Sequence, residues 1–185
     1  MNDSHNWKSL LVLAGVACLS VFCPEAASAQ EAKPKLILQI TVDQLRGDLP
    51  GRYLDRMGEG GFRYLLEEGV VFANAHHQHA NTETIVGHTT LATGANPAVH
   101  GMIGNVWFDR GSGEMTYNIE DDRYELLTKG ADVDKSSEAD PTQKLARTEG
   151  RSPAAILSST FSDELAIHTA GKAKVFGVSI KDRGA

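Results

Sequence analysis

The sequence has 185 residues, of which 41% are hydrophobic and 23% are charged, and its formal net charge is −6. This composition is typical of a globular protein and excludes a strongly basic surface of the kind that binds nucleic acid or an anionic membrane. The length allows about one domain, so we expect one hydrophobic core and not a complete large enzyme.

Residues 1–29 have the features of a cleaved signal peptide. Lys8 precedes an apolar run at 10–22, and Ala27 and Ala29 supply the small residues that a signal peptidase recognises. The apolar run is shorter than the roughly 20 residues that a membrane-spanning helix needs. We therefore expect a periplasmic or secreted protein without a membrane anchor.

Both cysteines, Cys18 and Cys23, lie within this leader. The mature chain, residues 30–185, is therefore expected to form neither disulfides nor thiolate sites. Lipid attachment at Cys18 is an alternative, although Gly15 occupies the position where lipidation signals prefer leucine.

The mature chain begins with the pattern of a strand, a helix and a second strand. Residues 36–42 are apolar and rich in β-branched side chains, which predicts a buried strand that ends at Asp43. A helical pattern at 61–68 and a short apolar run at 70–72 follow. This order predicts a parallel crossover connection.

The middle of the chain predicts another helix and a hairpin. Residues 84–93, closed by Gly94, favour a helix despite their β-branched threonines. Residues 106–108 and 115–117 flank a glycine-rich turn, which predicts two antiparallel strands.

A polar stretch at 131–151 separates the hairpin from the last predicted elements. It contains Pro141 and lacks any periodicity, so we expect a surface insertion that carries no chemistry. A capped helix at 159–168 and an apolar strand at 174–180 come after it.

Strands that alternate with helices predict an α/β fold with an open, mostly parallel sheet and flanking helices. Ligands of such sheets bind beyond the carboxyl ends of the strands. Asp43 and residues 181–183 lie at two such ends, so they are expected to share one cleft.

Three polar positions each have a structural and a functional interpretation. Asp43 either caps a turn or binds a cation, since a carboxylate directly after a buried strand is costly without a partner. Thr84 either caps a helix or attacks a phosphate, because the helix amino terminus and a metal ion would both favour its alkoxide. Asn105, in a loop that contains Gly101 and Gly104, either holds a turn or directs its amide at a ligand.

Two cations follow the last predicted strand. Lys181 and Arg183 would together neutralise a phosphate, with Arg183 making a two-pronged contact. The alternative interpretation is that Lys181 and Arg183 are solvated charges at the end of a strand.

The spacing of several histidines suggests a metal site, but we expect other roles for them. His76, His77 and His79 resemble a zinc site, yet on an extended segment only His77 and His79 share a face. We therefore expect a surface or supporting role for them. His88 and His100 are expected to pack against a helix or to hydrogen-bond within a loop.

Five motifs contain these candidate residues: Val42-Asp43-Gln44, Thr82-x-Thr84-x-x-Gly87-His88-Thr89, Thr93-Gly94, Val99-His100-Gly101-x-x-Gly104-Asn105-x-Trp107-x-Asp109-Arg110 and Ser179-x-Lys181-Asp182-Arg183. Taken together, they resemble the alkaline phosphatase superfamily, and within it the bacterial periplasmic alkaline phosphatases close to the nucleotide pyrophosphatase/phosphodiesterases. The resemblance covers roughly residues 35–185 and implies the amino-terminal part of such a catalytic domain.

The resemblance implies a site with two zinc ions that acts on a small phosphate ester. Asp43 and Thr84 would ligate one ion, and Thr84 would attack phosphorus to form a phosphothreonine, which water on the second zinc would hydrolyse. Asn105, Lys181 and Arg183 would hold phosphate oxygens. The resemblance places the other ligands, two aspartates and three histidines, beyond residue 185, so we expect an incomplete fold that is inactive by itself.

The Lys181-x-Arg183 pair favours monoesters, because a monoester has an anionic oxygen that a diester replaces with a carbon substituent. A phosphodiesterase or nucleotide pyrophosphatase is the first alternative, and a noncatalytic exported binding domain is the second. A sulfatase is disfavoured, since the nucleophile region lacks the Cys or Ser followed by x-Pro-x-Arg.

Overall fold

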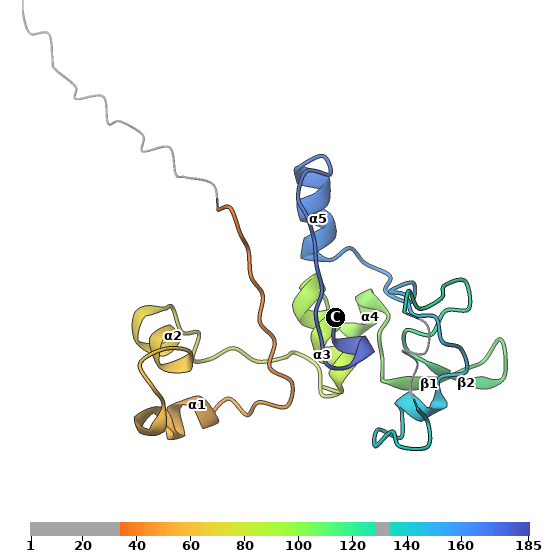
Figure 1. Cartoon of the computed structure of the whole chain (residues 1–185), viewed down its shortest axis with the longest axis horizontal. Coiled ribbons are helices and arrows are strands. Elements are labelled where there is room, and N and C mark those ends of the chain that lie inside the picture. Colours follow the sequence, from red (N-terminus) through yellow and green to blue (C-terminus); the bar gives the residue numbers. More distant parts are fainter. Residues whose placement is uncertain (1–33, 129–133) are drawn as a thin grey trace, which may run out of the picture. The chain divides into compact units, whose positions relative to one another are not determined.

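A computed structural model describes residues 34–128 and 134–185 (Figure 1). The predicted signal peptide and the first part of the predicted insertion lie outside the described residues. One unit of the chain ends at Gln39 and a second extends from Ile40 to Ala185. All the helices and strands of the described residues belong to the second unit.

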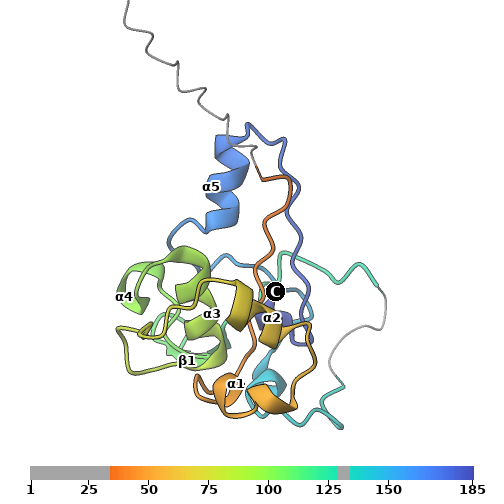
Figure 2. The same ribbon diagram turned by 90° about the vertical axis from the view of Figure 1, so that its left-hand side faces the viewer.

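The described residues form short helices and one hairpin. The α-helices are α1 Leu49–Arg52, α2 Phe62–Glu68, α3 Thr84–Thr93, α4 Pro97–His100 and α5 Phe161–His168. The strands are β1 Val106–Asp109 and β2 Glu114–Tyr117, and the 3-10 helices are η1 Leu54–Arg56, η2 Gln143–Leu145 and η3 Asp182–Gly184. Helices α3 and α4 lie next to each other in two perpendicular views (Figures 1 and 2).

The core lies between α3 and the hairpin. Ile85 and Val86 come from α3, Met102 from the loop after α4, and Tyr117 from the end of β2. Burial of a side chain of this size stabilises a fold by about 1.5–3 kcal/mol. These contacts hold the amino terminus of α3 against the hairpin, and both elements contribute to the candidate site.

Three predicted helices are confirmed with small shifts of their ends. Helix α2 covers the pattern at 61–68, α3 has the predicted bounds, and α5 begins two residues after the predicted start. Thr160 precedes α5 and forms a capping box, in which its hydroxyl accepts from the Asp163 N–H at 3.2 Å.

The predicted hairpin is also confirmed. Strands β1 and β2 are antiparallel, with Val106 opposite Tyr117 and Asp109 opposite Glu114. Gly113 completes the turn with φ +76°, a conformation that favours glycine.

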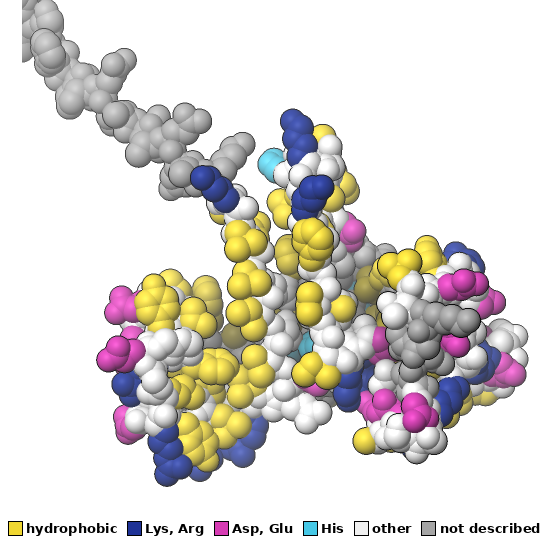
Figure 3. Space-filling view, viewed as in Figure 1, with side chains coloured by type: hydrophobic (Ala, Val, Ile, Leu, Met, Phe, Trp, Pro, Cys, Tyr) yellow, Lys and Arg dark blue, Asp and Glu magenta, His cyan; other side chains and the backbone are white. Residues whose placement is uncertain are grey.

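The described residues do not form the predicted open parallel sheet. Segments 36–42, 70–72 and 174–180 form no strands, and the sheet contains only β1 and β2. A buried parallel strand needs neighbouring strands and covering helices, whereas Leu36 is 78% and Val178 is 95% exposed. Figure 3 shows many such hydrophobic side chains on one face.

None of the helices in 34–128 and 134–185 combines the length and the apolar composition required to cross a membrane.

Candidate functional site

Thr84 and Asp43 lie together at the start of α3. Thr84 is the first residue of the helix and Glu83 occupies the N-cap position, so the N-cap interpretation of Thr84 is wrong. The Thr84 hydroxyl instead donates to Asp43 Oδ2 at 3.3 Å. Backbone N–H groups and the positive end of the helix dipole at this point favour a negative charge near the Thr84 oxygen.

Asn105 is fixed beside the same helix end. Its side-chain Oδ1 accepts from the Ile85 N–H at 3.2 Å, and the backbone N–H of Asn105 donates to Glu83 Oε2 at 2.6 Å. Its carbonyl accepts from Asn118 Nδ2 at 2.5 Å. Because Oδ1 serves the helix, the Nδ2 group of Asn105 is the part of the amide that can donate to a ligand.

Lys181 and Arg183 converge on one carboxylate. Lys181 Nζ donates to Asp140 Oδ2 at 2.8 Å, and Arg183 Nη2 donates to the same oxygen at 2.5 Å. Burial would raise the pKa of Asp140, but hydrogen bonds from Lys181, Thr142 and Arg183 hold this pKa below its ordinary value. Asp140 is therefore ionised at neutral pH.

The buried hydroxyl of Tyr117 holds the other side of Arg183. Arg183 Nη1 donates to Tyr117 OH at 3.3 Å, and that hydroxyl donates to Asp182 Oδ1 at 2.7 Å. Arg151 Nε binds the second Asp182 oxygen at 2.6 Å. Burial, followed by the hydrogen bond to Asp182, raises the pKa of Tyr117, so the phenol keeps its proton.

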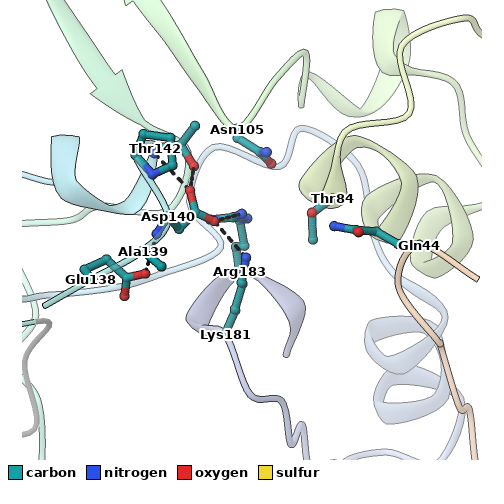
Figure 4. Close-up of a pocket in the computed structure, with 10 residues that line it drawn as sticks. Gln44, Thr84, Asn105, Glu138, Ala139, Asp140, Thr142, Lys181 and Arg183 are labelled. Carbon is teal, nitrogen blue, oxygen red and sulfur yellow. Dashed lines mark hydrogen bonds and ion pairs between the residues drawn. The ribbon is translucent and has the colours of Figure 1, made fainter.

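Thr84, Asn105, Lys181 and Arg183 line one open pocket of about 430 Å³ (Figure 4). Gln44 and residues 138–142 complete its lining. The four side chains that the sequence proposes for phosphate chemistry thus lie around a single cavity, although they span nearly 100 positions of the chain. Asp43 is connected to this cavity through its hydrogen bond to Thr84.

Asp140 is the pocket residue that sequence reasoning missed. It lies within the stretch 131–151, which was expected to carry no chemistry, and it lines the pocket. Its local signal was the Asp-Pro-Thr turn, in which Oδ1 accepts from the Thr142 N–H at 2.9 Å and the Thr142 hydroxyl at 2.6 Å. That signal predicts a turn but does not predict what the second carboxylate oxygen contacts.

The clustered histidines make separate contacts. The rings of His77 and His79 are 5.0 Å apart, whereas His76 hydrogen-bonds Asn74 at 3.0 Å. His79 Nε2 lies 2.9 Å from the Thr90 hydroxyl, which places His79 against α3. This arrangement agrees with a supporting role.

His100 is fully buried and hydrogen-bonded, as predicted for this residue. Its Nδ1 accepts from the Met102 N–H at 3.1 Å, so a neutral ring carries its proton on Nε2, 3.1 Å from the Thr90 hydroxyl. Burial, and then the nearby His79, lowers the pKa of His100. His88 packs near η3, because a Cβ atom on Gly184 would lie 3.5 Å from its Cε1.

The side-chain oxygens of Asp43 and Thr84 lie close enough together to contact one cation. Their side-chain oxygens lie 3.3 Å apart, and carboxylate oxygen is an ordinary zinc ligand. Within residues 34–128 and 134–185, no group of three or more His, Cys, Asp or Glu side chains is placed to hold a metal ion. The pair therefore fits part of a metal site.

Comparison with known proteins gives a consistent family match. The family of type I phosphodiesterases and nucleotide pyrophosphatases matches residues 37–169. A protein of Myroides odoratus named calcium-transporting ATPase is 35% identical over 97% of this chain, and alkaline phosphatase PafA of Elizabethkingia meningoseptica is 33% identical over 92%. The chain spans only 30% and 29% of the lengths of these two relatives.

Solved structures of PafA resemble this chain as well. The wild-type enzyme gives a TM-score of 0.63 at 33% identity, and a variant with four substitutions gives 0.66 at 31% identity. Each match covers 77% of this chain and 25% of the PafA chain.

Proposed function

Because the chain belongs to the type I phosphodiesterase/nucleotide pyrophosphatase family, and so to the alkaline phosphatase superfamily, we propose that it forms the amino-terminal part of a metal-dependent phosphatase. The complete enzyme hydrolyses phosphate monoesters through a phosphothreonine on Thr84. The observation that carries this proposal is the shared pocket of Thr84, Asn105, Lys181 and Arg183.

The substituted PafA structure supports the choice of these residues. Its four substitutions fall on a threonine, an asparagine, a lysine and an arginine. The interval from the threonine to the asparagine equals that from Thr84 to Asn105, and one residue separates the lysine from the arginine, as between Lys181 and Arg183. The same four residue types thus recur with matching local spacing.

Thr84 acts as the nucleophile in this proposal. Its oxygen attacks phosphorus as its proton leaves, and the bond from phosphorus to the leaving oxygen breaks, so the alcohol departs with the bonding pair and takes up a proton. Asp43 and Thr84 would hold one of two zinc ions, and a bound ion would lower the pKa of the hydroxyl and offset negative charge. Water then hydrolyses the phosphothreonine and frees Thr84.

Asn105, Lys181 and Arg183 bind the phosphoryl oxygens. Asn105 offers its Nδ2 group, because its Oδ1 is bound to α3. Lys181 and Arg183 offer the N–H groups that neither Asp140 nor Tyr117 uses. These donors are held before reaction begins, so they stabilise charge that grows in the transition state.

A phosphodiesterase is the second candidate, because the matching family is described by that activity. The two adjacent cations favour the monoester, whose phosphate carries the larger charge. ATP also belongs among the test substrates, since one relative is named as an ATPase.

We further propose that the protein is exported and acts in the periplasm or outside the cell. Residues 1–29 supply the signal peptide pattern on which this proposal rests. A small phosphate ester, and not a nucleic acid, is the proposed substrate. The open parallel sheet also belongs to this proposal, since the exposed apolar segment at 174–180 suits a strand with neighbours.

The test is Thr84→Ala in the full-length protein, with an aryl phosphate as substrate. Turnover should fall by at least about 10³-fold, since the variant has no oxygen to form the covalent intermediate. Thr84→Ser keeps a hydroxyl and should retain part of the activity. Acid quenching of the wild type should trap phosphate on Thr84.

Full turnover by Thr84→Ala would refute the proposal that Thr84 is the nucleophile. An inactive wild type that still binds phosphate would favour a noncatalytic exported binding domain. A larger kcat/KM for an aryl diester than for the monoester would favour the phosphodiesterase.

A further inference from the structure

We propose that Asp140 is a positioning residue that holds Lys181 and Arg183 in the arrangement that selects a monoester, an inference that rests on the proposed function. A single carboxylate oxygen, Oδ2, accepts from Lys181 at 2.8 Å and from Arg183 at 2.5 Å. Two cations that would otherwise repel each other are thereby joined at one point.

The Asp140 carboxylate is itself fixed by its own loop. Its Oδ1 accepts two hydrogen bonds from Thr142, at 2.9 Å and 2.6 Å. The Asp140 N–H donates to Glu138 Oε1 at 2.6 Å. Both carboxylate oxygens are therefore occupied, and the carboxylate cannot turn away from the cations without losing these contacts.

Burial makes this ion pair difficult to break. The side chains of Arg183 and Asp140 are only 3% and 11% exposed, whereas Lys181 is 41% exposed. Separating a buried pair leaves an uncompensated charge, which is strongly destabilising. Asp140 is therefore a lasting part of the pocket wall and not a side chain that swings aside for each substrate.

Asp140 leaves other donors of both cations for a ligand. It uses one N–H group of Lys181 and one of Arg183, and each side chain carries more. A further N–H group of Arg183, on Nη1, is taken by the Tyr117 hydroxyl. In Figure 4, Asp140 meets the ends of Lys181 and Arg183 on one side, and Thr84 lies on the other side of them.

The interval of the chain that contains Asp140 differs in length from that of PafA. The interval between Asn105 and Lys181 is longer here than the interval between the asparagine and the lysine substituted in the PafA variant. The polar stretch 131–151 lies within this longer interval. The role of Asp140 therefore rests on contacts within this chain and not on the positions substituted in PafA.

The charge on the pocket explains how Asp140 affects selectivity. Lys181 and Arg183 are balanced by Asp140 and Glu138, which line the same cavity. A monoester dianion needs both cations in place, whereas a diester carries a single negative charge. Loss of the Asp140 contacts should therefore weaken monoester turnover much more than diester turnover.

The test is Asp140→Asn in the full-length protein, with Asp134→Asn as the matched control. Asn retains an oxygen that accepts from Thr142, so the turn is preserved. Asp134 is exposed, accepts similar bonds from Ser136 and Ser137, and has no cation partner in the described residues. Both variants remove one negative charge from the same segment.

Asp140→Asn should lower kcat/KM for an aryl monoester by about 10- to 100-fold, because two charge-assisted hydrogen bonds are lost. The same variant should change aryl diester turnover by less than about 3-fold. Asp134→Asn should change neither substrate, and Asp140→Glu should restore part of the monoester rate.

Equal losses on both substrates would overturn the proposal, because they would show a general structural defect. Unchanged monoester turnover, or tighter inhibition by inorganic phosphate, would overturn it too, because the carboxylate would then compete with phosphate.

A measurement without turnover separates this proposal from the proposed function. Side-chain N–H signals of Arg183, observed by NMR, should be protected from exchange in the wild type and in Asp134→Asn, but not in Asp140→Asn. Protection that survives Asp140→Asn would overturn the positioning role. If protection is lost as expected while Thr84→Ala keeps full activity, the proposed function fails but the hold of Asp140 on Arg183 stands.

Discussion

The two sides of the pocket differ in how completely this chain builds them. On one side Arg183 is almost fully buried and is held by Asp140 and Tyr117. On the other side Asp43 and Thr84 share one exposed hydrogen bond of 3.3 Å. The side with Lys181 and Arg183, which we propose to bind the anion, is therefore a preformed part of the fold, while the side with Asp43 and Thr84, which we propose to bind metal, is supported by few contacts in the described residues.

This difference shows that the side chains on two sides of one site can be held in place to different degrees. The proposed phosphate donor Arg183, in η3, is fixed by side chains from β2 and from the stretch before η2. Oxygens that would bind a cation need further ligands to be held equally well, since a structured zinc site has about four. Substitutions on the two sides should therefore differ in their effects on stability and turnover.

The largest effect is expected from Arg183→Met on the stability of the chain. The change leaves Asp140 buried with only Lys181 as a cation partner, so the free energy of unfolding should fall by about 3 kcal/mol. Urea unfolding measures this change. Arg110→Met, at an exposed arginine, is the control and should cost less than about 0.5 kcal/mol. Equal stability of the two variants would show that the anion-binding side is not preformed.

Lys181→Ala in the full-length protein tests whether the side with Lys181 and Arg183 binds the phosphate of the substrate. It should lower kcat/KM for an aryl monoester by about 30-fold and affect a diester much less, because one charge-assisted contact disappears. Lys174→Ala removes an exposed lysine nearby and should change neither rate. Equal losses on both esters would remove the reason to prefer a monoesterase.

The pH dependence of stability tests whether the buried His100, which contacts Thr90 of α3, stabilises the fold in its neutral form. The pKa of His100 is lowered from its ordinary value of 6.5, so the folded state keeps this ring neutral while the unfolded state takes up a proton. Stability is therefore present above pH 6.5 and is lost as the pH falls, by up to about 1.4 kcal/mol for each pH unit.

Thermal unfolding between pH 7.5 and pH 5 measures this loss. His100→Asn keeps an acceptor for the Met102 N–H and should flatten the pH dependence. His168→Asn, at an exposed histidine, should leave it unchanged. The same pH slope in His100→Asn as in the wild type would contradict this role of His100.

The smallest effect on the free energy of unfolding is expected from Asp43→Asn. Its exposed hydrogen bond to Thr84 predicts a change in unfolding free energy below about 0.5 kcal/mol without zinc. Urea unfolding again provides the comparison with Arg183→Met. A loss as large as that of Arg183→Met would mean that both sides of the pocket are equally built into the fold.

Local sequence patterns predict the elements that depend on local interactions. Helix α3, the cap of α5 at Thr160 and the β1–β2 hairpin each follow from periodicity, capping or turn chemistry within a few residues. The segment 174–180 has the composition of a buried strand, but composition cannot supply the neighbours that a parallel strand requires. The expected sheet is therefore not formed by the described residues.

The candidate site is predictable where side chains follow recognisable elements. Asp43 and residues 181–183 each follow an apolar run, which predicted a shared cleft, and the resemblance to the alkaline phosphatase superfamily added Thr84 and Asn105 to it. Asp140 was missed because its partners lie more than 40 positions away, and a polar stretch without periodicity gives no sign of such contacts. Long-range ion pairs of this kind depend on the fold and not on local pattern.

The Tyr117 hydroxyl ties the alignment of the hairpin to the guanidinium of Arg183. Tyr117 is the last residue of β2 and pairs with Val106, and side chains alternate between the two faces of a strand. A slip of one residue between the strands would carry the phenol to the opposite face and release Arg183. The length of the turn at 110–113 therefore sets the geometry of a distant arginine, and lengthening that turn by one residue should loosen it.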